Sequence, residues 1–278
     1  MNQILTLNKR QKIIVTSILI TLGLLSGLLT TRLVIDLGLR FKFVLALGVL
    51  AYLLSLWSLW EGMSEPSSAA RRTKAIILLI LPVCYTIAVA SFYYVLPIRW
   101  FTRLPVALFF GLSFYLLLLA QNVFNIAAIR TIPLYRAAST AGFVLTVFSA
   151  LCLYSVIEAL NVQFYWNGSL VMLVSFPLIL QILWATKMED NISPLIFAQS
   201  AILSLLLGEL ALVLSFWPTE VRIRSFAIAS VLTSAMYILV GITTHHLRER
   251  LGKLEVWEYL GYGSIVWVMA FFVTILAE

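Results

Sequence analysis

The chain has 278 residues, of which 62% are hydrophobic and only 11% are charged, and its mean hydropathy is +1.02. A soluble domain has about 25% charged residues and could not bury so much apolar surface, so the composition excludes a soluble globular protein. The net charge of +7 would suggest nucleic acid as a partner for a soluble protein, but the 19 lysines and arginines lie almost entirely at the ends of apolar segments. Anionic lipid headgroups are the simpler partner for cations placed there.

Apolar segments recur along the whole chain, each about 20 residues long, which is the length an α-helix needs to cross a hydrocarbon core of about 30 Å. The sequence therefore predicts an all-α fold, a polytopic transmembrane helical bundle of about nine spans within a range of eight to ten. The connections between segments are too short for a soluble domain, so residues 1–278 should form a single integral membrane domain. The predicted spans are 13–34, 41–60, 75–97, 103–126, 137–160, 167–186, 194–217, 224–246 and 256–277.

The distribution of cations predicts the orientation of these spans. With a cytoplasmic N-terminus, twelve cations would lie on the inner side and seven on the outer side, so the positive-inside rule favours N-in and, with nine spans, C-out. The inner cations are spread over five short connections rather than a continuous groove, so we expect them to contact anionic lipids and not nucleic acid. They are Lys9, Arg10, Lys12, Arg71, Arg72, Lys74, Arg130, Arg136, Lys187, Arg248, Arg250 and Lys253.

Glu209 is the most unusual residue of the predicted spans, because apolar residues surround it well inside the seventh span. A carboxylate at membrane depth costs about 2.5 to 3.5 kcal/mol on insertion scales. We therefore expect Glu209 to face the protein interior and to be protonated or paired. It could carry protons or contact a substrate, or its carboxyl group could simply lock one helix to another.

The fourth span becomes polar towards its inner end. Gln121 and Asn125 are one helical turn apart and share a face, so they could form hydrogen bonds between helices or line a cavity that opens to the cytoplasm. Hydrogen bonding between helices is the commoner use of such amides.

A stripe of small and polar residues runs along the eighth span at steps of three and four residues. Small residues let a neighbouring helix approach closely, and serine and tyrosine can form hydrogen bonds with it. The stripe is typical of a packing seam first and of a solute path second. It consists of Ser230, Ser234, Tyr237, Gly241 and His245.

Small residues also mark other spans. Gly23 and Gly27 form a small-xxx-small pair in the first span, and Ser200, Ser204 and Gly208 lie on one face of the seventh span. Such faces favour close packing within the chain or between copies.

Motifs of known chemistry are absent from the sequence. It contains no HExxH or GxSxG motif and no aspartate-rich motif for Mg²⁺ and a diphosphate, and its six lysines lie at span ends or in connections, which excludes a Schiff base in the last helix. The consecutive His245 and His246 diverge on a helix, and Cys84 and Cys152 lie deep in apolar runs, so we expect neither a metal site nor a cofactor. The triplet from Asn167 to Ser169 matches a glycosylation acceptor, but it lies at a span boundary where attachment is not expected.

One segment carries a family resemblance. Residues 121–142, QNVFNIAAIRTIPLYRAASTAG, resemble a segment of uncharacterised multi-pass membrane proteins of bacteria with small genomes. The resemblance covers about a tenth of the chain. It implies a bacterial plasma membrane and no specific activity.

Three functional hypotheses remain open from the sequence. The first is a non-enzymatic membrane subunit or assembly component that packs with itself or with another membrane protein, since the connections are too short to hold a catalytic domain. The second is a small-solute or proton-coupled transporter, which would use Glu209 and the face formed by Gln121 and Asn125. The third is a lipid-modifying enzyme in which Glu209, Tyr237 and His245 would have to converge.

Overall fold

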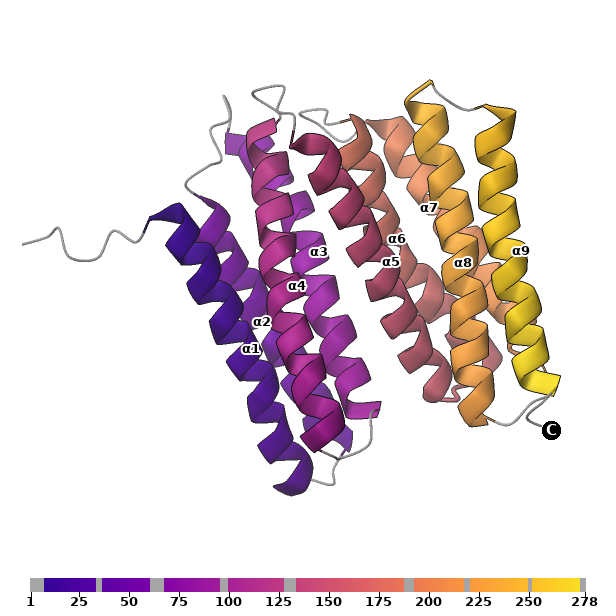
Figure 1. Cartoon of the computed structure of the whole chain (residues 1–278), viewed down its shortest axis with the longest axis horizontal. Helices are drawn as coiled ribbons and strands as arrows, with labels where there is room; N and C mark the ends of the chain where they lie inside the picture. The colour runs from indigo at the N-terminus through magenta and orange to yellow at the C-terminus, as the bar shows by residue number, and fades with distance from the viewer. Residues whose placement is uncertain are drawn as a thin grey trace, which may run out of the picture. The chain divides into compact units, whose positions relative to one another are not determined.

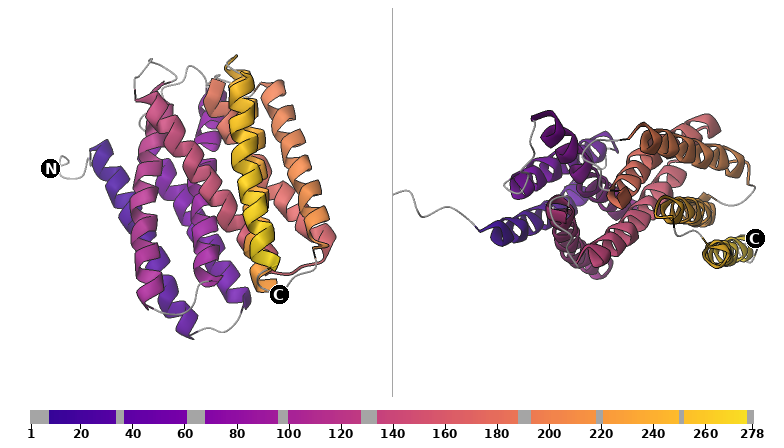
Figure 2. Two further views of the ribbon diagram at one scale, coloured as in Figure 1. Left: turned by 45° about the vertical axis from the view of Figure 1, so that its right-hand side comes forward. Right: turned by 90° about the horizontal axis from the view of Figure 1, so that it is seen from above.

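A computed structural model of the chain describes residues 8–33, 37–60, 68–95, 100–127, 134–187, 193–217, 221–249 and 252–275. Over these residues the fold is all-helical, with nine helices that are each long and apolar enough to cross a membrane (Figures 1 and 2). This confirms the predicted fold class. The helices are α1 (Lys9–Leu33), α2 (Leu37–Leu59), α3 (Ser68–Val95), α4 (Trp100–Ala127), α5 (Tyr135–Ala159), α6 (Phe164–Lys187), α7 (Pro194–Leu214), α8 (Val221–Leu247) and α9 (Lys253–Ile275).

The helices coincide in order with the predicted spans and differ from them mainly at their ends. The largest difference is at α3, which begins at Ser68 although the third span was predicted to begin at residue 75. Hydropathy marks only the part of a helix that lies in hydrocarbon. The helical backbone can continue into the headgroup region, because long cationic side chains such as Arg72 reach water there. The prediction was therefore short by the polar first turns.

The chain divides into two compact units, Met1–Leu145 and Thr146–Glu278, and the boundary falls within α5. In the first unit, α1 packs against α2 and α4, and α3 packs against α2 and α4. In the second unit, α6 packs against α7 and α8, α7 also contacts α8, and α8 packs against α9. A single membrane domain therefore stays a prediction.

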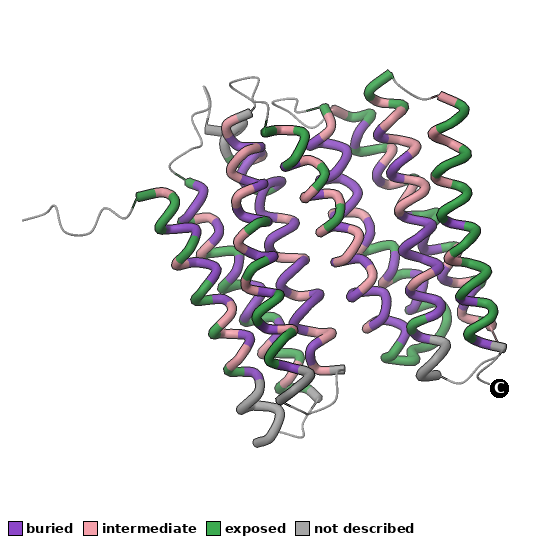
Figure 3. Tube along the Cα trace, viewed as in Figure 1, coloured by how far each residue is buried: buried purple, intermediate pink, exposed green. Residues whose placement is uncertain are grey.

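Large apolar side chains lie on the outside of both units, as expected where hydrocarbon rather than water is the solvent. The helices differ in how much of their surface is covered (Figure 3). The spanning part of α3 is 61% buried, whereas that of α9 is only 11% buried. Helix α9 therefore presents most of its circumference to its surroundings and rests mainly on α8.

Small residues bring neighbouring helices together within each unit. Helices α6 and α7 meet at Gly168 and Gly208, where a Cβ atom at Gly168 would lie 2.8 Å from the carbonyl oxygen of Gly208. In the first unit, a Cβ atom at Gly23 would lie 2.8 Å from Leu47 Cδ2. The small-residue faces predicted in the first and seventh spans are thus used for packing within the chain.

Candidate functional site

Glu209 is exposed on α7, so the expectation that it faces the protein interior is wrong. The buried face of α7 holds Ser200, Ser204 and Gly208, because these small residues allow the close approach of α6. That packing turns the opposite face outward. The expectation for Glu209 was drawn from its apolar neighbours alone, whereas the covered face of α7 is the predicted small-residue face.

The exposed face of α7 is an apolar stripe interrupted only by Glu209. Its apolar members recur at the three- and four-residue steps of one helical face. Glu209 lies five residues before the end of the helix at Leu214, about 7.5 Å along the axis. We call this surface the α7 stripe, and it consists of Ile202, Leu205, Leu206, Glu209 and Val213.

Gln121 and Asn125 are both fully buried in the first unit. Asn125 Nδ2 donates a hydrogen bond to the backbone oxygen of Leu59 at 3.2 Å, which ties α4 to the last turn of α2. This is the interhelical hydrogen bonding expected of the pair. Both amide atoms of Gln121 and the Oδ1 atom of Asn125 have no hydrogen-bond partner in the part of the chain that the structure describes.

Most of the polar stripe on α8 faces α9. The ring of Tyr259 lies 5.1 Å from that of Tyr237 and 5.7 Å from that of His245, measured between centroids. It also sits against Gly241, where an added Cβ atom would collide with it. Ser230 is only partly buried and donates its hydroxyl hydrogen to the backbone oxygen of Phe226. The α8 stripe therefore acts as a packing seam from Ser234 to His245.

The indole of Trp267 extends the α8–α9 seam. Its Nε1 atom donates a hydrogen bond to Ser234 Oγ at 2.8 Å. We expect Trp267→Phe to lower the free energy of unfolding by about 0.5–1.5 kcal/mol, the usual net contribution of one such bond. Trp257→Phe is the matched control, because Trp257 is 72% exposed near the start of the same helix. Denaturant titrations that give both variants the same stability would contradict the assignment.

The three residues of the enzyme hypothesis do not converge. Helices α7 and α8 follow each other along the chain and pack side by side. Glu209 lies one to two turns before the end of α7, whereas Tyr237 and His245 lie 16 and 24 residues after the start of α8. At 1.5 Å per residue they are separated from Glu209 by about 15 Å or more along the axis, which is too far for shared acid–base work.

A buried polar network in the second unit was not predicted. The carboxylate of Glu158, near the end of α5, is 3% exposed. Asn167 Nδ2 donates to Glu158 Oε1 at 2.8 Å and to Ser215 Oγ at 2.9 Å, so the network joins the ends of α5, α6 and α7. Glu158 lies at the predicted end of the fifth span, where a carboxylate is expected to be solvated. The buried position of Asn167 agrees with the expectation that its acceptor triplet is not glycosylated.

A cationic and aromatic cluster lies in the first unit, where α2 and α4 begin. The guanidinium of Arg103 is fully buried and lies 4.9 Å from the ring centroid of Tyr93. The guanidinium of Arg40 lies 6.0 Å from that of Tyr94. Arginine gains from the face of an aromatic ring when it is desolvated, which explains how these two cations are held. The sequence predicted them only as charges at span ends.

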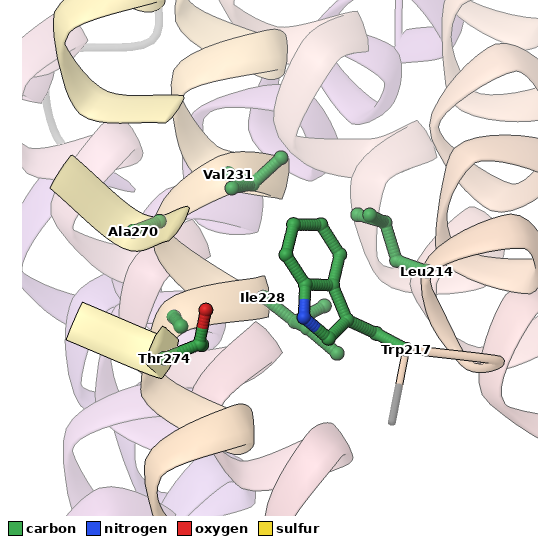
Figure 4. A pocket seen from close by; sticks show the side chains of 7 residues that line it. Leu214, Trp217, Ile228, Val231, Ala270 and Thr274 are labelled. Carbon is green, nitrogen blue, oxygen red and sulfur yellow. The ribbon is translucent and has the colours of Figure 1, made fainter. Parts of the chain in front are cut away.

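A small apolar pocket lies in the second unit beneath the indole of Trp217 (Figure 4). The ring also packs edge-on against Phe271 of α9 at 6.1 Å. The hydroxyl of Thr274 is used internally, since it donates to the backbone oxygen of Phe271. The pocket can therefore accept only apolar atoms. Its lining is Leu214, Trp217, Ala227, Ile228, Val231, Ala270 and Thr274.

A more polar groove of about 230 Å³ lies between α7 and α8. Gln199, Thr243 and His246 supply its polar lining, and Ile202 joins it to the α7 stripe. Across the described ranges, no group of three or more His, Cys, Asp or Glu side chains could hold a metal ion.

A family comparison covers nearly the whole chain. Residues 23–273 match DUF5656, a family described as proteins of unknown function. The chain belongs to the DUF5656 family. No curated protein and no solved structure matches this DUF5656 protein. Membership agrees with a protein of unknown activity, and the matched region is far longer than the 22 residues from 121 to 142 that carried the first resemblance.

Proposed function

We propose that this DUF5656 protein is a non-enzymatic membrane subunit that binds another membrane protein through the α7 stripe. The observation that carries the proposal is the exposure of Glu209 within an otherwise apolar helix face. The small-residue face of the same helix is already occupied by α6, so the stripe is the face of α7 that remains for a partner.

The energetic argument starts from the cost of the carboxyl group. Facing hydrocarbon, an ionised carboxylate costs about 2.5 to 3.5 kcal/mol at the centre of a span. This is an upper bound for Glu209, which lies five residues before the end of α7, but such groups normally face a protein or a water-filled interior. A neighbouring helix that supplies a cation or a hydrogen-bond donor removes this cost. The apolar residues on either side of Glu209, such as Leu206 and Val213, would pack against the same helix.

The charge pattern of the chain selects the kind of partner. Lysines and arginines of this sequence lie at span ends or in connections. Two of those that lie about one turn inside a helix, Arg40 and Arg103, are already held over tyrosine rings, which favours a different protein over a second copy. A transmembrane helix of another protein with a lysine, arginine or histidine one to two turns inside the bilayer fits the stripe. The groove at Ile202 extends this surface towards the start of α7.

The two other hypotheses lose their main support. A proton-coupled transporter would need Glu209 beside an internal path, whereas the side chain is on the outside of α7. A lipid-modifying enzyme would need Glu209 close to Tyr237 and His245, which lie at other depths. Site-specific photocross-linking from the α7 stripe to a transmembrane segment of another protein tests the subunit proposal directly.

We place the protein in the bacterial plasma membrane with its N-terminus in the cytoplasm, on the charge distribution and the resemblance of residues 121–142. A reporter that is active only in the cytoplasm should then be active when fused to the N-terminus and inactive when fused to the C-terminus. An active C-terminal fusion would show that the number of crossings is even or that part of the bundle is inverted.

Anionic lipids should contact the inner connections in this orientation, because cations near the surface gain about 1 kcal/mol each from an anionic leaflet. Among the inner cations that the structure describes, six are exposed near helix ends, whereas Lys12 and Lys74 are buried. The exposed ones are Arg10, Arg72, Arg136, Lys187, Arg248 and Lys253. Nucleic acid is not an expected partner for cations that are spread over separate short connections.

A further inference from the structure

Among the buried side chains of the first unit whose polar atoms find no hydrogen-bond partner in the described residues, three are uncharged and lie on α2 and α4. Ser55, Gln121 and Asn125 are each 0% exposed. The atoms concerned are Ser55 Oγ, Gln121 Oε1 and Nε2, and Asn125 Oδ1. A buried donor or acceptor left unsatisfied destabilises the folded protein, so four such atoms together favour a bound molecule that pairs with them.

The hydrogen bond between Asn125 and Leu59 fixes the depth of these atoms relative to one another. It fixes α4 against α2 at the end of α2, and α2 and α4 run in the same direction because a single antiparallel helix separates them along the chain. Ser55 lies one turn before Leu59, and Gln121 lies one turn before Asn125. Since residues four apart share a helix face, Ser55 and Gln121 lie at the same depth on α2 and α4.

The chemistry of these side chains favours an uncharged ligand. Gln121 presents a donor and an acceptor side by side, the Ser55 hydroxyl can do either, and Asn125 Oδ1 accepts. None of these groups is charged, so an ion would be desolvated there without a counter-charge from them. Lys12, a buried cation of α1, holds its Nζ atom over the ring of Trp57 at 5.4 Å, and Trp57 lies on another face of α2 than Ser55.

We infer that Ser55, Gln121 and Asn125 form a binding site for a small uncharged solute whose own donor and acceptor are adjacent, as in a primary amide. A primary amide can form a pair of hydrogen bonds with the carboxamide of Gln121 and leave its remaining hydrogen for Ser55 or Asn125. The site lies in the first unit and does not depend on the α7 stripe.

Acetamide is the probe for this site, and N,N-dimethylacetamide is the comparison molecule because it has the acceptor but no donor. The full-length protein in lipid nanodiscs is titrated with each while saturation-transfer NMR reports binding. We expect saturable acetamide binding in the millimolar range, no competition from dimethylacetamide, and at least tenfold weaker binding by Gln121→Leu. Gln181→Leu, which replaces a buried amide on α6, should bind like the parent.

Each remaining outcome counts for or against the site. If Gln121→Leu does not fold, Ser55→Ala becomes the test of the site. It removes only one hydroxyl group and should still weaken acetamide binding several-fold. Equal binding by the parent and the folded variants would overturn the proposal. The absence of saturable binding by the parent would also overturn it and would leave water as the molecule that satisfies these atoms.

Discussion

Gly168→Ala should lower the free energy of unfolding towards the upper end of the range of about 1–3 kcal/mol that overpacking usually costs. The new Cβ atom would lie 2.5 Å from Leu212 Cγ and 2.8 Å from the backbone oxygen of Gly208. The leucine side chain can move, but the backbone oxygen can move only if α6 and α7 separate. Chemical or thermal unfolding of the purified protein in one detergent measures the effect.

The matched control for Gly168→Ala is Gly261→Ala on α9, where an added Cβ atom meets nothing within 4 Å. Alanine also favours the helix more than glycine, so this variant should be as stable as the parent or more stable. Gly208→Ala should resemble Gly168→Ala, because its Cβ atom would lie 2.9 Å from the backbone oxygen of Gly168. Equal stabilities of Gly168→Ala and Gly261→Ala would show that α6 and α7 are not packed as described.

Glu209→Leu should have opposite effects on the isolated protein and on its complex. It replaces the only carboxylate of an exposed apolar stripe, so insertion of α7 should improve by up to about 3 kcal/mol on insertion scales. The amount of partner that purifies with the protein in mild detergent should fall to background, because the group that pairs with the partner's cation is gone.

Two further variants separate charge from shape at Glu209. Glu209→Gln keeps a hydrogen-bonding head and should retain part of the partner, whereas Glu258→Leu removes an exposed carboxylate close to the start of α9 and should retain all of it. If Glu209→Leu folds normally and still purifies with as much partner as the parent, the α7 stripe does not bind the partner.

The number and order of the helices could be predicted from the sequence, because hydropathy reports directly on what hydrocarbon accepts. The face that each helix turns towards its neighbours was harder to predict. Glu209 illustrates this, since its apolar neighbours along the chain suggested burial, whereas the covered face of α7 is set by the contact of Gly168 with Gly208. In a membrane, exposed and buried positions are both apolar, so periodicity carries little information.

Periodicity succeeded where the two faces of a helix differ in size or polarity. The stripe from Ser230 to His245 was predicted as a packing seam, and from Ser234 onward it meets Tyr259 and Trp267 of α9. Glu158 was missed for the opposite reason, because a carboxylate near a span end is normally solvated, and its burial depends on Asn167 from the next helix. Contacts between side chains from separate helices cannot be derived from one helix at a time.

Photocross-linking from Val213 tests the central claim most directly, because this residue is 68% exposed and lies one turn from Glu209 on the same face. A photoreactive amino acid is placed there in cells, and Trp257, exposed on α9, serves as the matched position. We expect a cross-link from Val213 to a transmembrane segment of another protein that carries a lysine, arginine or histidine at that depth. The cross-link should disappear in Glu209→Leu and persist in Glu258→Leu. Cross-links from Val213 to lipid alone, or to a second copy of this chain, would contradict it.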